Sequence, residues 1–183
     1  MQKLIRYIIC VITIAALIFL LKPIYFYVKV LIIQKQLYTQ WDQSIKQGEI
    51  KTENKIYPIG KIKINSSNIN SIILSGDIEK SLNYGIAHIP NTKKPGNKGN
   101  VVLAAHRDTF FRNLKDIKLN DIIEIKHLNG KDIFRVFDIK VIQPYETNYL
   151  YNSENCDLTL ITCYPFEYFG NSPLRYIVRA KLS

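Results

Sequence analysis

The chain is poor in the side chains that build disulfide frameworks and metal sites, with three cysteines and three histidines in 183 residues. Three cysteines cannot all pair, so at least one thiol stays free. Cys156 and Cys163 lie seven residues apart on one apparent strand, where their side chains point to opposite faces, so a disulfide between them is geometrically implausible. Cys10 lies in an apolar run and is interpreted as a small hydrophobic residue. His88, His106 and Cys163 show no metal-ligand spacing, so a metal site is the weakest option and no cofactor is predicted.

The sequence also has no long basic run, no aromatic-basic repeat and no internal repeat. A nucleic-acid partner is therefore not predicted, although the formal net charge is +10. Residues 1–35 contain five of the basic residues and no acidic one, so the rest of the chain carries only about +5. A mild bias of this size fits a protein that works beside an anionic membrane or wall polymer.

An apolar segment near the N-terminus predicts a membrane anchor. Residues 7–21 carry no charge, and a second apolar run, 24–33, is interrupted only by Lys29. The first run is short for a membrane span, which needs about 20 residues. Lys22 can nevertheless extend its side chain to the interface, and the aromatic residues 25–27 suit an interfacial belt. A cleaved signal peptide would need a small-x-small site after the apolar core, and none follows, so we predict an uncleaved signal-anchor.

The whole chain is predicted to divide into three parts. A cytoplasmic tail and membrane-spanning signal-anchor occupy residues 1–33, a polar stalk or short helix occupies 34–55, and a single β-domain occupies 56–183. Basic residues lie on both sides of the apolar run, so the positive-inside rule alone does not decide which side of the membrane the domain faces.

The domain has the pattern of short strands with little helix. Val101–Ala105 is uniformly apolar, as expected for a strand buried on both faces. Asn129-Gly130 is a strong hairpin signal between two such strands, and Ser75-Gly76-Asp77 predicts the start of a short helix. The other strand-sized segments are 60–64, 69–74, 122–128, 132–141, 156–163 and 174–182. About eight strands predict a closed or nearly closed β-barrel.

Cys163 is the first candidate for chemistry, because it closes an apolar strand. Tyr164-Pro165 follows and cannot continue a central strand, so the thiol is expected at the rim of the barrel rather than in its core. The predicted loops 143–155 and 164–173 flank this strand and would form the walls of a groove. The alternative is a buried, inert cysteine. A nucleophilic cysteine would need a nearby cation or imidazole to help it ionise.

His106 is the best candidate for that imidazole. It follows five apolar residues and precedes the polar Arg107-Asp108-Thr109, so it also marks the end of a strand. The ordinary alternative is a surface histidine in a turn. His127, beside the predicted hairpin turn, is expected to be solvated, and His88 is expected to be a structural hydrogen-bonding residue rather than a catalyst.

Arg175 begins the last predicted strand, which in a barrel could lie beside the strand of Cys163. Its guanidinium could donate two N–H groups to a substrate carbonyl or a developing oxyanion. Arg179, four residues later, should face the same side and lie deeper along the strand. A structural salt bridge fits either arginine, and Arg175 is favoured because it lies nearer to Cys163.

Three segments together resemble the sortases, which are membrane-anchored cysteine transpeptidases of Gram-positive bacteria. Thr159-Leu-Ile-Thr-Cys163 matches the TLxTC signature of that family. Val102-Leu-Ala-Ala-His-Arg-Asp-Thr-Phe-Phe111 is similar to its histidine segment, and Pro173-Leu-Arg-Tyr-Ile-Val-Arg179 to its arginine strand. The similarity runs from about Ile59 to Leu182 and looks most like class D. One departure is Ala105, where that class often has glycine before the histidine.

The resemblance implies an eight-stranded sortase-like β-barrel with short helices, preceded by a transmembrane helix. It implies that Cys163 attacks the threonine carbonyl of an LPxT-type sorting signal to form a thioacyl-enzyme. His106 would protonate the leaving amine, and Arg175 would position the substrate or stabilise the oxyanion. The partners implied are exported surface proteins and an amine of the peptidoglycan precursor or of another surface protein. The domain would then face outward from a single-pass anchor in the cell membrane.

Two alternatives stay open at this point. The first is a catalytically inactive barrel that acts as a binding scaffold for surface proteins. The second is a hydrolytic cysteine peptidase that acts on wall peptides, in which water rather than an amine resolves the thioacyl-enzyme.

Overall fold

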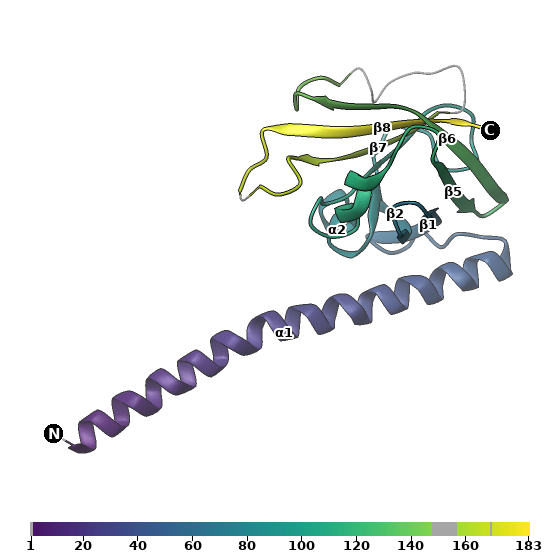
Figure 1. Cartoon of the computed structure of the whole chain (residues 1–183). Coiled ribbons are helices and arrows are strands. Elements are labelled where there is room, and N and C mark those ends of the chain that lie inside the picture. Colours follow the sequence, from purple (N-terminus) through teal and green to yellow (C-terminus); the bar gives the residue numbers. More distant parts are fainter. Residues whose placement is uncertain (1, 148–156, 169) are drawn as a thin grey trace. The chain divides into compact units, whose positions relative to one another are not determined.

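The structure is a computed structural model, which describes residues 2–147, 157–168 and 170–183 (Figure 1). The chain divides into two compact units, Met1–Gln36 and Leu37–Ser183. The predicted boundaries at residues 33 and 55 stay predictions.

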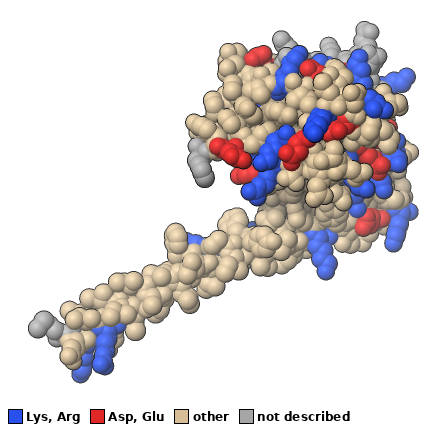
Figure 2. All heavy atoms as spheres, viewed as in Figure 1, with Lys and Arg blue, Asp and Glu red and all other residues tan. Residues whose placement is uncertain are grey.

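The first unit is the N-terminal part of a long helix, α1, which runs from Gln2 to Gln47. Its most apolar window has a mean hydropathy of 2.7 and is fully unburied, so the helix is long and apolar enough to cross a membrane. Pro23 lies inside the helix without ending it, so the two apolar runs of the sequence form one continuous element. Thr13 donates its hydroxyl hydrogen bond to the backbone carbonyl of Ile9 at 2.5 Å, which satisfies a polar group within the apolar stretch. Figure 2 shows a largely uncharged surface along this part of the helix.

The last part of α1 belongs to the second unit. Leu37, Trp41 and Ser44 are buried, and their spacing places them along one stripe of the helix. Asp42, on the same segment, forms an ion pair with Lys61 at 3.1 Å. Residues 37–47, predicted as stalk or short helix, are therefore helical and packed as part of the domain.

Eight strands form a closed β-barrel in the order β1-β2-β3-β4-β7-β8-β6-β5, as predicted. Most neighbours are antiparallel, but β2 pairs with β3 and β4 pairs with β7 in parallel. A closed barrel leaves no free sheet edge. The strands are β1 Ile56–Ile64, β2 Ile69–Gly76, β3 Ile86–His88, β4 Val101–Ala104, β5 Ile122–His127, β6 Gly130–Ile142, β7 Asp157–Tyr164 and β8 Leu174–Leu182.

Two short helices connect the strands. Helix α2, Ile78–Tyr84, begins after Asp77, whose carboxylate accepts a hydrogen bond from the Lys80 backbone N–H at 3.1 Å and so caps the first turn. This cap matches the start predicted from the sequence. A 3-10 helix, η1, covers Arg112–Asp116. The β5–β6 hairpin turns at Asn129-Gly130, also as predicted, and Gly130 takes a positive φ of 151° there.

Side-chain alternation separates the inner from the outer face of the barrel. On β4, β7 and β8 the inward residues are apolar and buried: Val101, Leu103, Leu158, Leu160, Val178 and Ala180. Residues of the opposite parity lie on the outer face. They include Cys163 on β7 and both Arg175 and Arg179 on β8. The barrel thus carries its candidate reactive groups on its surface, above a largely apolar interior.

Candidate active site

The pairing of three neighbouring strands brings the predicted site residues into one row. β4 and β7 run parallel with Ala104 opposite Ile161, so His106 and Cys163 each follow two residues beyond a paired position at the same end of the barrel. β8 runs antiparallel to β7 and places Arg175 directly opposite Cys163. Directly paired residues have Cβ atoms about 5 Å apart on the same face. The row therefore offers an imidazole, a thiol and a guanidinium side by side.

All three residues line one pocket of about 340 Å³, which we call the thiol pocket. Its walls come from the turn after β4 and from the β7–β8 loop. The lining residues are His106, Arg107, Asp108, Cys163, Gly170, Asn171, Ser172 and Arg175. Cys163 is half-buried and carries no disulfide, whereas the His106 side chain is exposed. Of the other two cysteines, Cys156 lies outside the described residues, and Cys10 is a free thiol on α1.

Thr162 fixes the strand end of His106 against that of Cys163. Its side chain is buried, at 3% exposure, and its hydroxyl donates a hydrogen bond to the Ala105 carbonyl at 2.7 Å. The Ala105 N–H in turn donates to the Ile161 carbonyl at 3.3 Å. These two bonds join the residues immediately before the imidazole to those immediately before the thiol, so the spacing of the pair depends on them.

Ala105 fits this arrangement without strain. It is buried in the apolar core, and it is not among the described non-glycine residues with positive φ. A glycine would therefore give no conformational advantage at this position. The backbone of His106 is fixed by the turn that follows, because its carbonyl accepts hydrogen bonds from the N–H groups of Thr109 and Phe111, at 3.4 and 3.1 Å, and the Phe111 ring is fully buried.

Arg175 is braced by the β7–β8 loop. Its Nη1 donates to the carbonyls of Leu174 at 2.9 Å and Ser172 at 3.1 Å, and the Ser172 hydroxyl donates to the carbonyl of Tyr164. Among the described residues, these are the only hydrogen bonds of this guanidinium, and none involves a carboxylate. Nε and Nη2 are therefore available to a ligand in the thiol pocket.

The aromatic side chains that follow the thiol form a compact cluster. The rings of Tyr164 and Phe166 have centroids 6.1 Å apart, and those of Phe166 and Tyr176 are 5.1 Å apart in an edge-to-face arrangement. Burial raises the pKa of the Tyr176 hydroxyl. This packing fixes the start of the β7–β8 loop directly after Cys163.

Arg107 is a site residue that the sequence reasoning missed. Its Nη2 donates to the carbonyls of Tyr168 and, at 3.3 Å, Gly170, and its guanidinium lies over the Tyr168 ring at 5.8 Å. It therefore ties the turn that carries His106 to the opposite wall of the thiol pocket. No sequence signal could have revealed this, because an arginine in a polar turn has the pattern of a solvated residue and its partners lie about sixty residues later.

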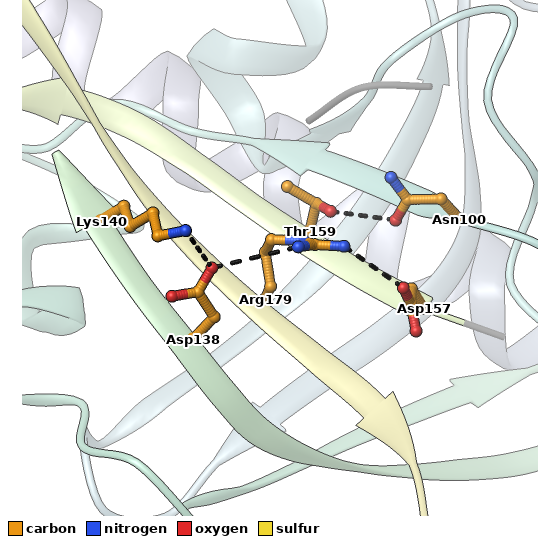
Figure 3. A network of polar contacts seen from close by, with 6 residues as sticks. All are labelled: Asn100, Asp138, Lys140, Asp157, Thr159 and Arg179. Atoms are coloured by element: carbon orange, nitrogen blue, oxygen red, sulfur yellow. Dashed lines mark hydrogen bonds and ion pairs between the residues drawn. The ribbon is translucent and has the colours of Figure 1, made fainter. Parts of the chain in front are cut away.

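Arg179 differs from Arg175 because carboxylates surround it (Figure 3). Its Nη2 lies 3.5 Å from Oδ2 of Asp157, whose side chain is only 3% exposed, and its Nη1 lies 4.0 Å from Oδ2 of Asp138. Lys140 reaches the same Asp138 oxygen at 3.2 Å. The salt-bridge interpretation of Arg179 is thereby confirmed. In the same network the Thr159 hydroxyl donates to Asn100 Oδ1 at 3.0 Å.

The other two histidines lie apart from the thiol pocket. His88 is buried, and its Nε2 lies within hydrogen-bonding distance of the Lys93 carbonyl, at 3.0 Å, which confirms the structural role predicted for it. Burial lowers the pKa of this imidazole. The expectation that His127 is solvated was wrong: its ring is 8% exposed and packs so closely on Gly96 that a Cβ there would lie 2.6 Å from Nδ1. Its Nε2 lies 3.4 Å from Asp132.

The fold agrees with what similar proteins show. The fold and the row of side chains define a class of closed β-barrels with a free thiol, an imidazole and a guanidinium at one end. A family model described as the sortase domain matches residues 62–183. The chain belongs to the sortase family. Sortases are membrane-associated cysteine transpeptidases that act on sorting signals of surface proteins and on amine acceptors.

The similar proteins include two D-type sortases and a sortase C1. The chain is 30% identical over 141 residues to sortase D of Bacillus subtilis (strain 168), which covers 76% of this chain and 71% of the relative. A structure of a Clostridium perfringens sortase D5 transpeptidase matches with a TM-score of 0.67 and 28% identity, over 81% of this chain and 94% of that one. Streptococcus agalactiae sortase C1 in complex with MTSET matches with a TM-score of 0.64 and 32% identity, over 69% and 67%.

Proposed function

We propose that this protein is a class D-like sortase that cleaves an LPxT-type sorting signal after its threonine and transfers the exported protein to an amine of the cell-wall precursor. The observation that carries the proposal is the row of His106, Cys163 and Arg175 on three adjacent strands, all lining one pocket. The arrangement supports the proposal, because a thiol, an imidazole and a guanidinium that line one pocket could act on the same bound peptide as nucleophile, proton carrier and hydrogen-bond donor.

The first half-reaction breaks the peptide bond after threonine. The Cys163 thiolate attacks the threonine carbonyl carbon, so that a C–S bond forms and the carbonyl oxygen gains negative charge. The protonated His106 imidazole then gives its proton to the departing nitrogen as the C–N bond breaks. The products are a thioester on Cys163 and the free amine of the leaving peptide.

The second half-reaction forms a new amide. An acceptor amine attacks the thioester carbonyl and gives a proton to His106, a C–N bond forms, the C–S bond breaks, and the thiolate returns. One amide replaces another, so the cycle needs no oxidant, reductant or nucleotide. In both halves Arg175 stands opposite Cys163 and donates hydrogen bonds to the oxyanion or positions the substrate.

Helix α1 supports a location at the cell membrane. Its apolar part is a candidate membrane span, and as an uncleaved signal-anchor it would hold the barrel at the outer face of the cell membrane as a single-pass protein. A sortase needs this location, because sorting signals and wall precursors meet outside the membrane.

The direct test uses the full-length protein in detergent with an LPxT-containing peptide and an amine. We expect cleavage after threonine and a new amide product, both measured by mass spectrometry. Cys163→Ala should abolish both, whereas Cys10→Ala, a matched cysteine replacement on α1, should change neither. Retention of cleavage by Cys163→Ala would contradict the proposal.

The same assay separates the two alternatives. A hydrolytic peptidase would release only the free acid, whatever the amine concentration. An inactive scaffold would bind the peptide without cleaving it, and Cys163 in the folded protein would not react with a thiol reagent.

A further inference from the structure

A second pocket adjoins the thiol pocket. It has a volume of about 340 Å³ and is lined by Arg107, Asp108, Arg112, Lys115, Phe166 and Glu167. Arg107 and Asp108 line both pockets, so the two cavities share one wall. We call the second cavity the basic pocket. Because the two pockets meet at Arg107 and Asp108, a single ligand could place one part in the basic pocket and another part beside Cys163.

The cations of the basic pocket are incompletely neutralised. Three cationic side chains face two carboxylates, which leaves a formal excess of one positive charge. Lys115 lies 3.5 Å from Glu167, but this carboxylate is 90% exposed, and ion pairs on the surface are weak. Arg112 forms no ion pair with any described residue.

Arg107, one of these three cations, is bonded to backbone carbonyls rather than to a described acidic side chain. Its Nη2 donates to the neutral backbone carbonyls of Tyr168 and Gly170. Its Nη1 is buried and has no hydrogen-bond partner among the described residues. Because Nη1 has no exposed surface, Arg107 acts on a ligand in the pocket through its charge rather than through this N–H.

A carboxylate is the ligand group that fits this pocket. It carries one negative charge, which matches the excess, and it accepts paired hydrogen bonds from a guanidinium. Asp108 and Glu167 would repel a group of higher negative charge. Asp108 also faces the thiol pocket, where its carboxylate would attract an ammonium group. The two pockets thus present the charge pattern of a zwitterionic amine.

We propose that the basic pocket binds a carboxylate carried by the acceptor amine, and so orients that amine toward the thioester on Cys163. This inference rests on the transpeptidase function proposed above and adds the chemical class of the second substrate. Binding through the carboxylate raises the effective concentration of the amine beside the thioester carbonyl. The bond changes are those of the second half-reaction: the amine loses its proton to His106, the C–N bond forms and the C–S bond breaks.

The test measures transfer by the full-length protein to matched acceptors. Glycine, γ-aminobutyrate and ε-aminocaproate are each compared with their own primary amide, which lacks the negative charge. For at least one of the three acceptors, we expect kcat/KM to be about tenfold higher for the amino acid than for its amide. This ratio corresponds to about 1.4 kcal/mol. High salt should reduce this ratio, because it screens partly exposed charges.

Two variants locate the effect. In Arg112→Gln/Lys115→Gln the carboxylate-to-amide ratio should fall to about one, whereas Lys118→Gln, which removes an exposed lysine outside the pocket, should keep it. The ratio is taken within each variant, so any change in thioester formation cancels. A ratio near one for every acceptor in the wild-type protein, or an unchanged ratio in the double variant, would overturn the inference and leave the transpeptidase intact. Absence of peptide cleavage would instead contradict the proposed function, and the inference with it.

Discussion

Two arginines on the outer face of β8 show how similar positions can serve different purposes. Arg175 lies opposite Cys163 on β7, and Arg179 lies opposite Thr159 on the same strand. Arg179 lies beside the carboxylates of Asp157 and Asp138, so its charge stabilises the fold. The recorded bonds of Arg175 go to backbone carbonyls, which leave its charge uncompensated. The neighbours of the two arginines distinguish the candidate site residue, Arg175, from the structural one, Arg179, because residue type and barrel face are the same.

The largest effect on activity is expected from His106→Ala. In the proposed mechanism the imidazole carries the proton in both half-reactions, and loss of general acid–base catalysis typically costs 10²- to 10⁴-fold, so we expect kcat for peptide transfer to fall by about 10³-fold. The side chain is exposed, so the midpoint of thermal unfolding should stay within about 2 °C of wild type. Activity within tenfold of wild type would remove His106 from the mechanism.

The second-largest loss of activity is expected from Arg175→Ala. Removing one oxyanion donor costs about 10²- to 10³-fold in kcat, and the two lost hydrogen bonds to backbone carbonyls should lower the free energy of unfolding by about 1–2 kcal/mol. Transfer kinetics and urea unfolding of the same preparation give both numbers. A larger loss of stability than of activity would make Arg175 a structural residue like Arg179.

Arg179→Met should have the opposite effect, with a large loss of stability and a small change in activity. It leaves the buried Asp157 carboxylate without its arginine, so we expect the free energy of unfolding to fall by about 3 kcal/mol, with kcat of the folded protein within threefold of wild type. Adding Asp157→Asn removes the uncompensated charge and should restore part of the stability. If the double variant is no more stable than Arg179→Met, the ion pair is not the cause.

Thr162→Val and Thr159→Val form a matched pair on β7. Each removes a buried hydroxyl that donates one hydrogen bond, so each should lower the free energy of unfolding by about 1–2 kcal/mol. Only Thr162 is bonded to Ala105, next to His106, so only its variant should also lower kcat, by about tenfold. Equal activity in the two variants would show that this bond does not position the imidazole.

The smallest effect is expected from Arg107→Lys. Lysine keeps the charge but cannot bond two carbonyls in a plane or stack on Tyr168 in the same way. The β7–β8 wall of the thiol pocket should become looser, so KM for the sorting peptide should rise about threefold to tenfold while kcat changes less. A change in kcat alone would indicate that Arg107 acts on the reaction itself.

Much of the barrel could be predicted because alternation and turn chemistry are local signals. The Asn129-Gly130 hairpin and the last strand, Leu174–Leu182, follow from such signals. β3 was not predicted, because a strand of three residues is too short to show a period. The continuation of α1 to Gln47 was only partly anticipated, since a polar stretch with Leu37 and Trp41 as its buried residues gives a weak helical pattern.

The residues of the candidate site could be predicted from the sequence, whereas their arrangement in space could not. Cys163, His106 and Arg175 each mark a strand end, which is visible in the sequence. The parallel pairing of β4 with β7, which places the imidazole beside the thiol, joins segments about sixty residues apart and has no local code. The clamp of Arg107 and the burial of His127 depend on the same kind of long-range contact.

The central claim is that the row on β4, β7 and β8 makes Cys163 the nucleophile. The most direct measurement is the intact mass of the full-length Cys10→Ala protein after brief reaction with an LPxT peptide near neutral pH, stopped with acid so that the thioester persists. We predict an adduct with the mass of the peptide up to its threonine, which fragmentation assigns to Cys163 and which an added amine removes. Peptide cleavage with no adduct on Cys163, or an adduct on another residue, would contradict the account.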